Sequence, residues 1–402
     1  MAVAVSPLNR AYLDYNATAP LRPEAREAAL TAMETTGNPS SVHAEGRAAR
    51  RIVEDARSEV ARLAGVSSRC VTFVSGGTEA ANAALNPLFG GGPNAEPLER
   101  LIVSAGEHAC VLSGHRFPIA EAAPLRPDGR VDLDWLEAAC RRPGRALVAL
   151  QGANNETGVI QPVAEAAALV HAADGFLLCD AVQLPGRIAC DISALGADAL
   201  MLSAHKMGGL KGAGALVAAG AGVSLGAPLM RGGGQERGLR AGTESVAAIA
   251  AFGAAARACL AEAATEPARL VGLRDRLTIA VRSLAGDAVV FAETAPRLPN
   301  TLCFAVPGVE AATLMIALDL AGIAVSSGSA CSSGKVAPSH VLAAMGAPPG
   351  LARGAIRLSL GWASGEADIE RFATALASVM ARLRAARRGP AALTVEAAPA
   401  RE

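Results

Sequence analysis

Two residues with complementary chemistry, Lys206 and Asp180, each follow a short apolar run that is typical of a buried strand. A lysine at the mouth of a buried crevice can lose its charge and form a Schiff base with an aldehyde. A carboxylate can keep the ring nitrogen of a pyridine protonated. Taken alone, Lys206 would be interpreted as a surface lysine in a loop. Together, the two residues supply what a pyridine aldehyde cofactor requires.

The run SGGTEA at residues 75–80 follows a predicted strand and opens a predicted helix. Gly76 and Gly77 allow close backbone approach, and Thr78 places a hydroxyl at the positive N-terminus of the helix. This combination suits an anion such as phosphate. Glycine-rich strand–helix turns are common, however, so the run by itself does not separate a phosphate site from an ordinary turn.

Eight cysteines are scattered along the chain, and Cys331 differs from the others in its neighbours. It lies in the run SSGSACSSGK, which we expect to be a loop that lets the thiol move. The alternative is an inert small residue in a turn. A free thiol has a pKa near 8.5, so a reactive Cys331 would need activation. The other cysteines show no zinc-ligand spacing and are expected to be mostly small buried residues; they are Cys70, Cys110, Cys140, Cys179, Cys190, Cys259 and Cys303.

The elements that must position these residues form an alternating pattern between about residues 50 and 260. Apolar runs that predict strands, with the polar residues that follow them, lie at 70–76, 100–108, 145–158, 175–183, 197–206 and 214–220. Runs with helical spacing lie between them, at 79–89, 133–142 and 163–173. This alternation predicts an α/β domain with a doubly wound, mostly parallel sheet. Ligands of such sheets bind at the carboxyl edge, where SGGTEA, GEHAC, NNETG, DAVQ and SAHK would converge on one crevice.

The pattern changes after about residue 265, where helices alternate with the runs PNTLCFAVPG and AIRLSLG. We therefore expect a large domain over 16–264, a smaller α+β domain formed by 1–15 and 265–388, and a frayed tail over 389–402. The uncharged stretch 212–230 contains five glycines, a proline and a serine, which favours a buried strand and a loop over a membrane span. Acidic and basic residues balance at 37 each, which gives no indication of nucleic-acid binding.

The ordered set SGGTEA, EHACVL, NNETG, DAVQ, SAHK, GGGQERGLRAGTE, SSGSACSSG and IRLSLG resembles the cysteine desulfurases of the NifS/IscS type. These belong to the class V aminotransferase family of fold-type-I pyridoxal-phosphate enzymes. The resemblance runs from LDYNATAP near the start to IRLSLG. It implies the fold-type-I architecture, pyridoxal 5'-phosphate as cofactor and L-cysteine as substrate.

The resemblance also implies roles for individual residues. Lys206 would hold the cofactor's aldehyde, Asp180 would pair with its ring nitrogen, Gln183 would bind its ring hydroxyl, and His108 would stack on its ring. Cys331 would carry the sulfur as a persulfide, so the catalytic residues would be Cys331, Lys206 and His108. The residues that would contact the cofactor are Gly77, Thr78, His108, Asn155, Asp180, Gln183, Ser203, His205, Lys206 and Thr243.

The substrate would be oriented by Asn155 and by Arg357, whose guanidinium would bind the substrate carboxylate in bidentate fashion. Thr243 resembles the residue that reaches the phosphate of the other subunit, which implies a homodimer. The sulfur would pass to an acceptor protein such as an iron–sulfur scaffold or a tRNA-thiolation relay. The resemblance implies neither nucleic-acid nor membrane binding, and without a signal sequence in the opening MAVAVSPLNR we expect a cytoplasmic protein.

Some positions depart from the family pattern. Ala204 and Leu210 stand where the family more often has glycine and proline, and we expect both to be tolerated. His43 and His340 fall in family-like segments, and a structural role is expected for each. Three alternatives remain open from the sequence. They are a selenocysteine lyase, a plain class V aminotransferase that leaves Cys331 without a task, and a non-enzymatic sulfur carrier, which would be expected to lack Lys206 or Asp180.

Overall fold

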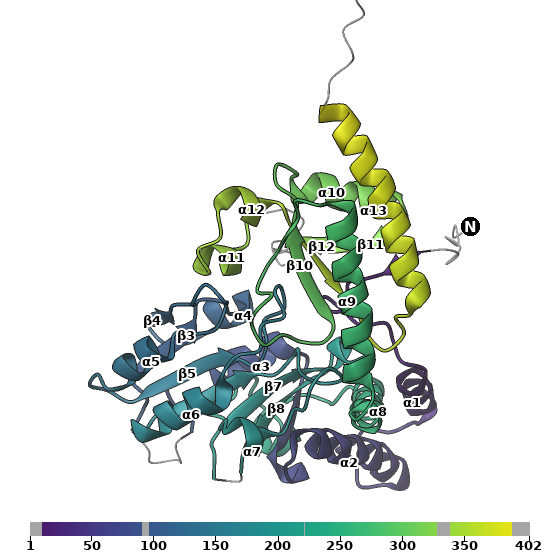
Figure 1. Cartoon of the computed structure of the whole chain (residues 1–402). Helices are drawn as coiled ribbons and strands as arrows, with labels where there is room; N and C mark the ends of the chain where they lie inside the picture. The colour runs from purple at the N-terminus through teal and green to yellow at the C-terminus, as the bar shows by residue number, and fades with distance from the viewer. Residues whose placement is uncertain (1–9, 91–95, 221, 328–337, 388–402) are drawn as a thin grey trace, which may run out of the picture.

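The computed structural model describes residues 10–90, 96–220, 222–327 and 338–387. Within these ranges a large sheet with its helices lies against a smaller unit of strands and long helices (Figure 1). The predicted tail 389–402 and Cys331 lie outside the described residues. The domain boundaries at residues 15 and 264 stay predictions.

The large sheet has seven strands in the order β2-β8-β7-β6-β5-β3-β4. All are parallel except β8, which runs antiparallel to both of its neighbours. The six predicted strands are confirmed, and β4 is an additional one. The strands are β2 (Val71–Val74), β3 (Arg100–Ser104), β4 (Ala120–Ala123), β5 (Ala146–Gln151), β6 (Phe176–Asp180), β7 (Ala199–Ser203) and β8 (Gly214–Ala218).

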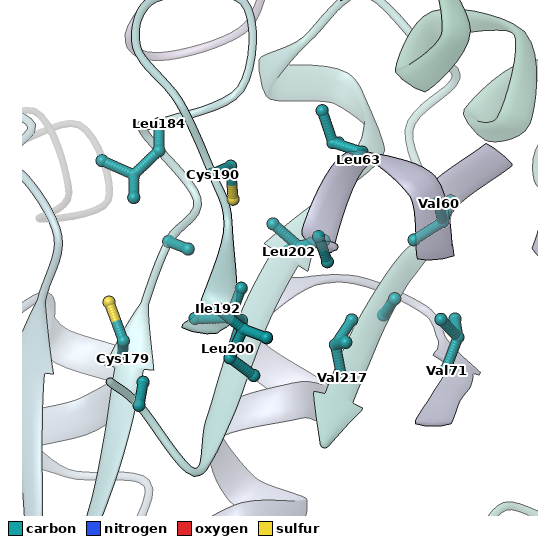
Figure 2. Close-up of a cluster of buried hydrophobic side chains, with 14 of the residues drawn as sticks. Val60, Leu63, Val71, Cys179, Leu184, Cys190, Ile192, Leu200, Leu202 and Val217 are labelled. Atoms are coloured by element: carbon teal, nitrogen blue, oxygen red, sulfur yellow. The ribbon is translucent and has the colours of Figure 1, made fainter. Parts of the chain in front are cut away.

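Helices cover both faces of this sheet because successive strand residues point to opposite sides. Leu200 and Leu202 of β7 belong to one buried cluster, whereas Met201 between them belongs to another. Figure 2 shows part of the first cluster, in which Val60 and Leu63 of α2 lie near the sheet. The helices of this unit are α1 (Pro23–Glu34), α2 (Ala44–Ala64), α3 (Gly77–Ala84), α4 (Ala109–Leu112), α5 (Leu133–Cys140), α6 (Val163–Ala172), α7 (Ile192–Leu195) and α8 (Val246–Glu262).

Two sequence features explain how these helices end and pack. The helix predicted over 79–89 stops at Ala84, because Asn86 precedes Pro87 and a residue before proline avoids the helical region. α1, α2 and α8 pack together, and α8 consists mostly of alanine. A Cβ added at Gly253 of α8 would lie 2.6 Å from the Cα of Ala56 in α2. Small residues therefore allow these helices to pack closely. Single-turn 3-10 helices complete the unit: η1 (Ser68–Cys70), η2 (Ala204–Lys206) and η3 (Gln235–Gly238).

The smaller unit is built on a four-stranded antiparallel sheet in the order β12-β13-β10-β9. A parallel pair, β1 and β11, brings the start of the chain to this unit. Ala11 and Leu13 are buried in the same cluster as residues of the C-terminal helices. The strands are β1 (Ala11–Tyr12), β9 (Val289–Val290), β10 (Thr301–Ala305), β11 (Ile323–Ala324), β12 (Ser326–Ser327) and β13 (Ala355–Ser359). The helices are α9 (Glu266–Leu284), α10 (Ala311–Leu320), α11 (His340–Ala344), α12 (Pro349–Arg353) and α13 (Glu366–Arg387).

No single helix of the described part of the chain is long and apolar enough to cross a membrane. Helices α8 and α9 pass that test only when taken together, by length and composition, and they are bent by 82° relative to each other. The uncharged stretch at 212–230 contains strand β8, as the sequence predicts.

Candidate active site

A pocket of about 340 Å³ lies where the strand ends of the large sheet meet the smaller unit. Of the predicted site residues that the structure describes, all except Thr243 line this pocket. The lining consists of Asn16, Ala17, Gly77, Thr78, His108, Cys110, Gln151, Ala153, Asn155, Asp180, Val182, Gln183, Ser203, His205, Lys206 and Arg357. The predicted convergence of polar strand ends is therefore present in the structure.

Asp180 and Lys206 reach the pocket from neighbouring parallel strands. Asp180 is the last residue of β6, and Lys206 lies in η2, directly after β7. The Oδ1 of Asp180 accepts a hydrogen bond of 3.0 Å from the backbone N–H of Val182. The Nζ of Lys206 donates a hydrogen bond of 2.7 Å to the backbone carbonyl of Asn16. Both side chains are thus held by backbone groups, at positions that the strands determine.

Two buried carboxyl groups interact at the pocket, Asp180 in its lining and Glu107 outside the lining. Burial raises the pKa of Glu107 well above its usual range, and the nearby charge of Asp180 raises it further. Burial also raises the pKa of Asp180, but the Val182 N–H and the nearby His108 and Lys206 oppose this increase. Glu107 is fully buried, and its Oε2 has no partner among the described residues. Since two adjacent buried carboxylates repel each other, Glu107 keeps its proton and Asp180 carries the charge.

His108 is the N-cap of α4, and its Nδ1 accepts a hydrogen bond of 3.1 Å from the backbone N–H of Cys110. Burial lowers the pKa of His108, so the neutral ring is favoured. Burial likewise lowers the pKa of His205 to about 4, and the ring of His205 lies 3.1 Å from the Oγ1 of Thr18. Two neutral imidazoles therefore line the pocket, one suited to stacking and the other to hydrogen bonding.

The N-terminus of α3 forms one end of the pocket. Gly77 and Thr78 lie in its first turn, and Ser203 and His205 face the same space from the end of β7. A Cβ added at Gly77 would lie 3.2 Å from Val182, so a larger residue would crowd the pocket wall. Free N–H groups and the helix dipole make this end suited to an anion.

The segment at residues 14–18 forms part of the pocket wall, which was not predicted from the sequence. The side chain of Asn16 donates to the carbonyl of Asn155 at 3.1 Å and to the Oγ1 of Thr301 at 2.9 Å. The backbone carbonyl of Asn16 accepts from both Lys206 and the Nε2 of Gln183. The run LDYNATAP was recognised only as the start of the family resemblance. Its position in the site depends on long-range packing, which no local pattern indicates.

Arg357 enters the pocket from β13 and is almost completely buried. Its Nη2 binds the Oδ1 of Asp14 at 2.7 Å, and its Nη1 donates to the carbonyl of Asn155 at 2.9 Å. The Nε has no partner among the described residues. The family resemblance implies that Arg357 and the side chain of Asn155 contact a substrate. The structure shows that Arg357 is also paired with a carboxylate of the protein itself, Asp14.

Cys110 departs from the expectation that the cysteines other than Cys331 are mostly small buried residues, because it is only partly buried. It lines the pocket two residues after His108, and its Sγ lies 3.0 Å from the His108 Nδ1. Burial raises the pKa of the Cys110 thiol, so it stays protonated and is a poor nucleophile. The run EHAC contains the only local signal for this position, since the thiol follows a strand-end histidine.

Several predicted residues lie away from the pocket. Thr243 is exposed to solvent and does not line it. His43 has the expected structural role, because its side chain caps α2 by accepting from the N–H of Gly46. His340 at the start of α11 forms a hydrogen bond of 2.9 Å with the backbone carbonyl of Glu107, which links the smaller unit to the sheet. Ala204 is completely buried.

The donor set of the pocket fits pyridoxal 5'-phosphate. Asp180 supplies a carboxylate, Lys206 an amine, and the first turn of α3 an anion site. Gln183 lines the pocket, and its Oε1 is buried without a partner among the described residues, so the cofactor's ring hydroxyl would satisfy it. The volume of about 340 Å³ is within the usual range for a small-molecule site.

Comparison with known proteins identifies the family. The class-V aminotransferase family matches residues 11–372. A cysteine desulfurase of Cereibacter sphaeroides is 41% identical over 94% of this chain and 97% of its own length. An IscS-like cysteine desulfurase of Mycobacterium tuberculosis is 38% identical over 94% of this chain and 98% of its own length. A solved NifS-like protein from Rickettsia africae superposes with a TM-score of 0.83 at 32% identity, covering 92% of this chain and 99% of that one. The chain therefore belongs to the class-V aminotransferase family and, within it, to the cysteine desulfurases.

Proposed function

We propose that this protein is a pyridoxal-phosphate-dependent cysteine desulfurase that converts L-cysteine to L-alanine and carries the released sulfur on Cys331. The observation that carries this proposal is the placement of Lys206 and Asp180 on neighbouring strand ends, with Arg357 facing the same pocket. A plain sulfur carrier would need neither an amine nor a buried carboxylate there.

The pocket residues divide the work between cofactor and substrate. Gly77, Thr78, Ser203 and His205 would bind the phosphate, Asp180 the ring nitrogen and Gln183 the ring hydroxyl, while His108 would stack on the ring. The bound cofactor supplies an electron sink that stabilises negative charge at the substrate α-carbon. Lys206 would hold the cofactor covalently and, once displaced by substrate, remove the α-proton at its Nζ. Arg357 would bind the substrate carboxylate, with Asn155 beside it.

Sulfur transfer would then depend on Cys331, which lies outside the described residues. Its thiolate attacks the sulfur of the substrate, so an S–S bond forms while the substrate C–S bond breaks. The electron pair of the broken bond stays with the β-carbon, which takes up a proton and becomes the methyl group of alanine. The persulfide then passes to an acceptor, for which an iron–sulfur scaffold or a thio-cofactor relay is the chemical class that fits.

We further propose a homodimer in which Thr243 reaches the phosphate of the partner subunit. Two features support this proposal. Thr243 is exposed, and the loop before it is fixed by one buried and one partly buried ion pair. Glu236 has a φ of 48° and binds both terminal nitrogens of Arg57 at 2.7 Å, while Arg240 binds Glu79 of α3 at 2.9 Å. A strained, anchored loop that presents an exposed hydroxyl is suited to a contact with a second subunit.

The deciding experiment measures sulfide and alanine from L-cysteine for the wild type and for Cys331→Ala, with Cys110→Ala as the pocket-thiol control. We expect Cys331→Ala to retain the yellow cofactor and its absorbance change on cysteine addition, but to lose sulfide release by at least about 100-fold. Cys110→Ala should keep most of the activity because its thiol is protonated. Near-full sulfide release by Cys331→Ala would favour a lyase, and amino-group transfer without sulfide would favour an aminotransferase.

A further inference from the structure

The ion pair between Arg357 and Asp14 has no role in the reaction as described above, yet it lies at the substrate pocket. Among the described residues, Asp14 is the only carboxylate within ion-pair distance of Arg357, with Nη2 and Oδ1 2.7 Å apart. The Arg357 side chain is 2% exposed and that of Asp14 is 20% exposed. A buried guanidinium without this partner would be an uncompensated charge.

The backbone holds Asp14 beside β13. Asp14 forms a parallel bridge with Ser359, two residues after Arg357. The N–H of Ser359 donates to the carbonyl of Leu13 at 2.8 Å, and the Oγ of Ser359 accepts from the N–H of Asn16 at 3.0 Å. The carboxylate is therefore fixed relative to the strand that carries Arg357, and it does not depend on a flexible surface side chain.

Two nitrogens of the guanidinium are thus restrained from different directions, by Asp14 and by the Asn155 carbonyl. An arginine side chain that is free to rotate loses conformational entropy when it binds a carboxylate. A guanidinium that is already held has lost that entropy before the substrate arrives, so its remaining N–H groups bind more tightly. We propose that Asp14 is a positioning residue that presents Arg357 to the α-carboxylate of the substrate. This inference rests on the proposed function, because it assumes that an amino acid binds in this pocket.

The test is a binding measurement that does not require turnover. Asp14→Asn keeps the size of the side chain and removes its charge. In the Cys331→Ala holoenzyme, the absorbance change of the bound cofactor reports the Kd of L-cysteine and of cysteamine, which is cysteine without its carboxylate. We expect Asp14→Asn to raise the Kd of L-cysteine about tenfold and to leave the Kd of cysteamine unchanged within about twofold. Asp14→Ala should have a larger effect in the same direction.

The controls separate positioning from folding. Asp319→Asn removes a carboxylate that pairs with Arg10 on the surface of the same unit, and it should change neither Kd. Equal increases for L-cysteine and cysteamine would indicate a merely structural role and overturn the inference. A lower Kd for L-cysteine would also overturn it, since Asp14 would then be a competitor of the substrate. If the protein with Asp14 intact gave no absorbance change with L-cysteine, the proposed function would fail and the inference with it.

Discussion

The two halves of the pocket are built in different ways. In the sheet half, His108, Asp180 and Lys206 lie at the ends of parallel strands of one sheet, and backbone pairing determines where each side chain emerges. In the other half, Asp14 and Arg357 are 343 residues apart in sequence. These residues, with Asn16, come from distant segments that are joined by a backbone bridge between Asp14 and Ser359 and by bonds from side chains to other side chains or to distant carbonyls.

This difference has consequences for both chemistry and robustness. The sheet half holds a carboxyl pair and an amine at fixed positions, which suits a cofactor that must not move. The second half joins segments that are distant in sequence and depends on polar contacts between them, so single substitutions should change how substrate is bound and how the two units stay together. Substitutions in the sheet half should instead abolish the chemistry while leaving the fold intact.

The largest expected effect in the sheet half comes from Lys206→Ala. It removes the covalent attachment and the base together, so turnover should fall by at least about 1000-fold. Borohydride treatment followed by peptide mass analysis should find the reduced cofactor on the 206 peptide of the wild type and on no peptide of the variant. Lys211→Ala changes an exposed lysine nearby and should keep both activity and labelling. Labelling of Lys211 in the wild type would refute the assignment.

The two buried carboxyls allow a sharper test of the sheet half. Asp180→Asn removes the charge that would pair with the ring nitrogen, and kcat should fall by about 100-fold or more. Glu107→Gln replaces a protonated acid by a neutral amide of the same shape, so kcat and the thermal midpoint should change little. Steady-state kinetics of both variants on matched preparations decide the point. A large loss in Glu107→Gln would mean that Glu107 is ionised and that the two carboxyls share the charge differently.

The sequence predicted the sheet half almost completely and the other half only in part. Strand ends can be read from apolar runs, and parallel strands bring their carboxyl ends to one edge, so Asp180 and Lys206 could be placed together without coordinates. Arg357 was assigned through the family resemblance, because nothing local to β13 indicates a pocket. Asp14 and Asn16 were missed because their neighbours in space come from β13, β10 and the NNETG turn, and no spacing rule connects these segments.

In the second half, Asn16→Ala should destabilise the fold more than a usual polar substitution. The Asn16 side chain bonds Asn155, Thr301 and Asn300, and all of these contacts are buried or partly buried. Removing it leaves several polar groups unsatisfied, which should lower the free energy of unfolding by roughly 3 kcal/mol. Urea unfolding followed by circular dichroism measures this change. Asn38→Ala, at an exposed turn, should lower it by no more than about 0.5 kcal/mol.

Glu156 lies where the large sheet unit meets the smaller unit. Its pKa predicts that the stability of the fold depends on pH. Burial raises its pKa to about 7, although its hydrogen bond from Ser339 and the charge of Arg357 oppose the increase. The Oγ of Ser339 donates to Glu156 and also caps α11 by accepting from the N–H of Leu342. The carboxyl group of Glu156 thus joins the turn after β5 to helix α11 of the smaller unit.

The sign of the effect follows from where the proton binds. Between about pH 4.5 and pH 7 the unfolded chain releases the proton of Glu156 while the folded chain keeps it, so stability due to this group falls as pH rises through that window. Glu156→Gln should remove this loss. Its free energy of unfolding should match the wild type at pH 4.5 and exceed it by about 3 kcal/mol at pH 8, because the introduced glutamine does not titrate while the pKa of Glu156 lies at about 7 in the folded chain. Glu165→Gln, at an exposed position of α6, should show no such difference. If the difference in free energy of unfolding between Glu156→Gln and the wild type were the same at both pH values, Glu156 would be ionised throughout. Its contact with Ser339 would then be an ordinary charge-assisted hydrogen bond.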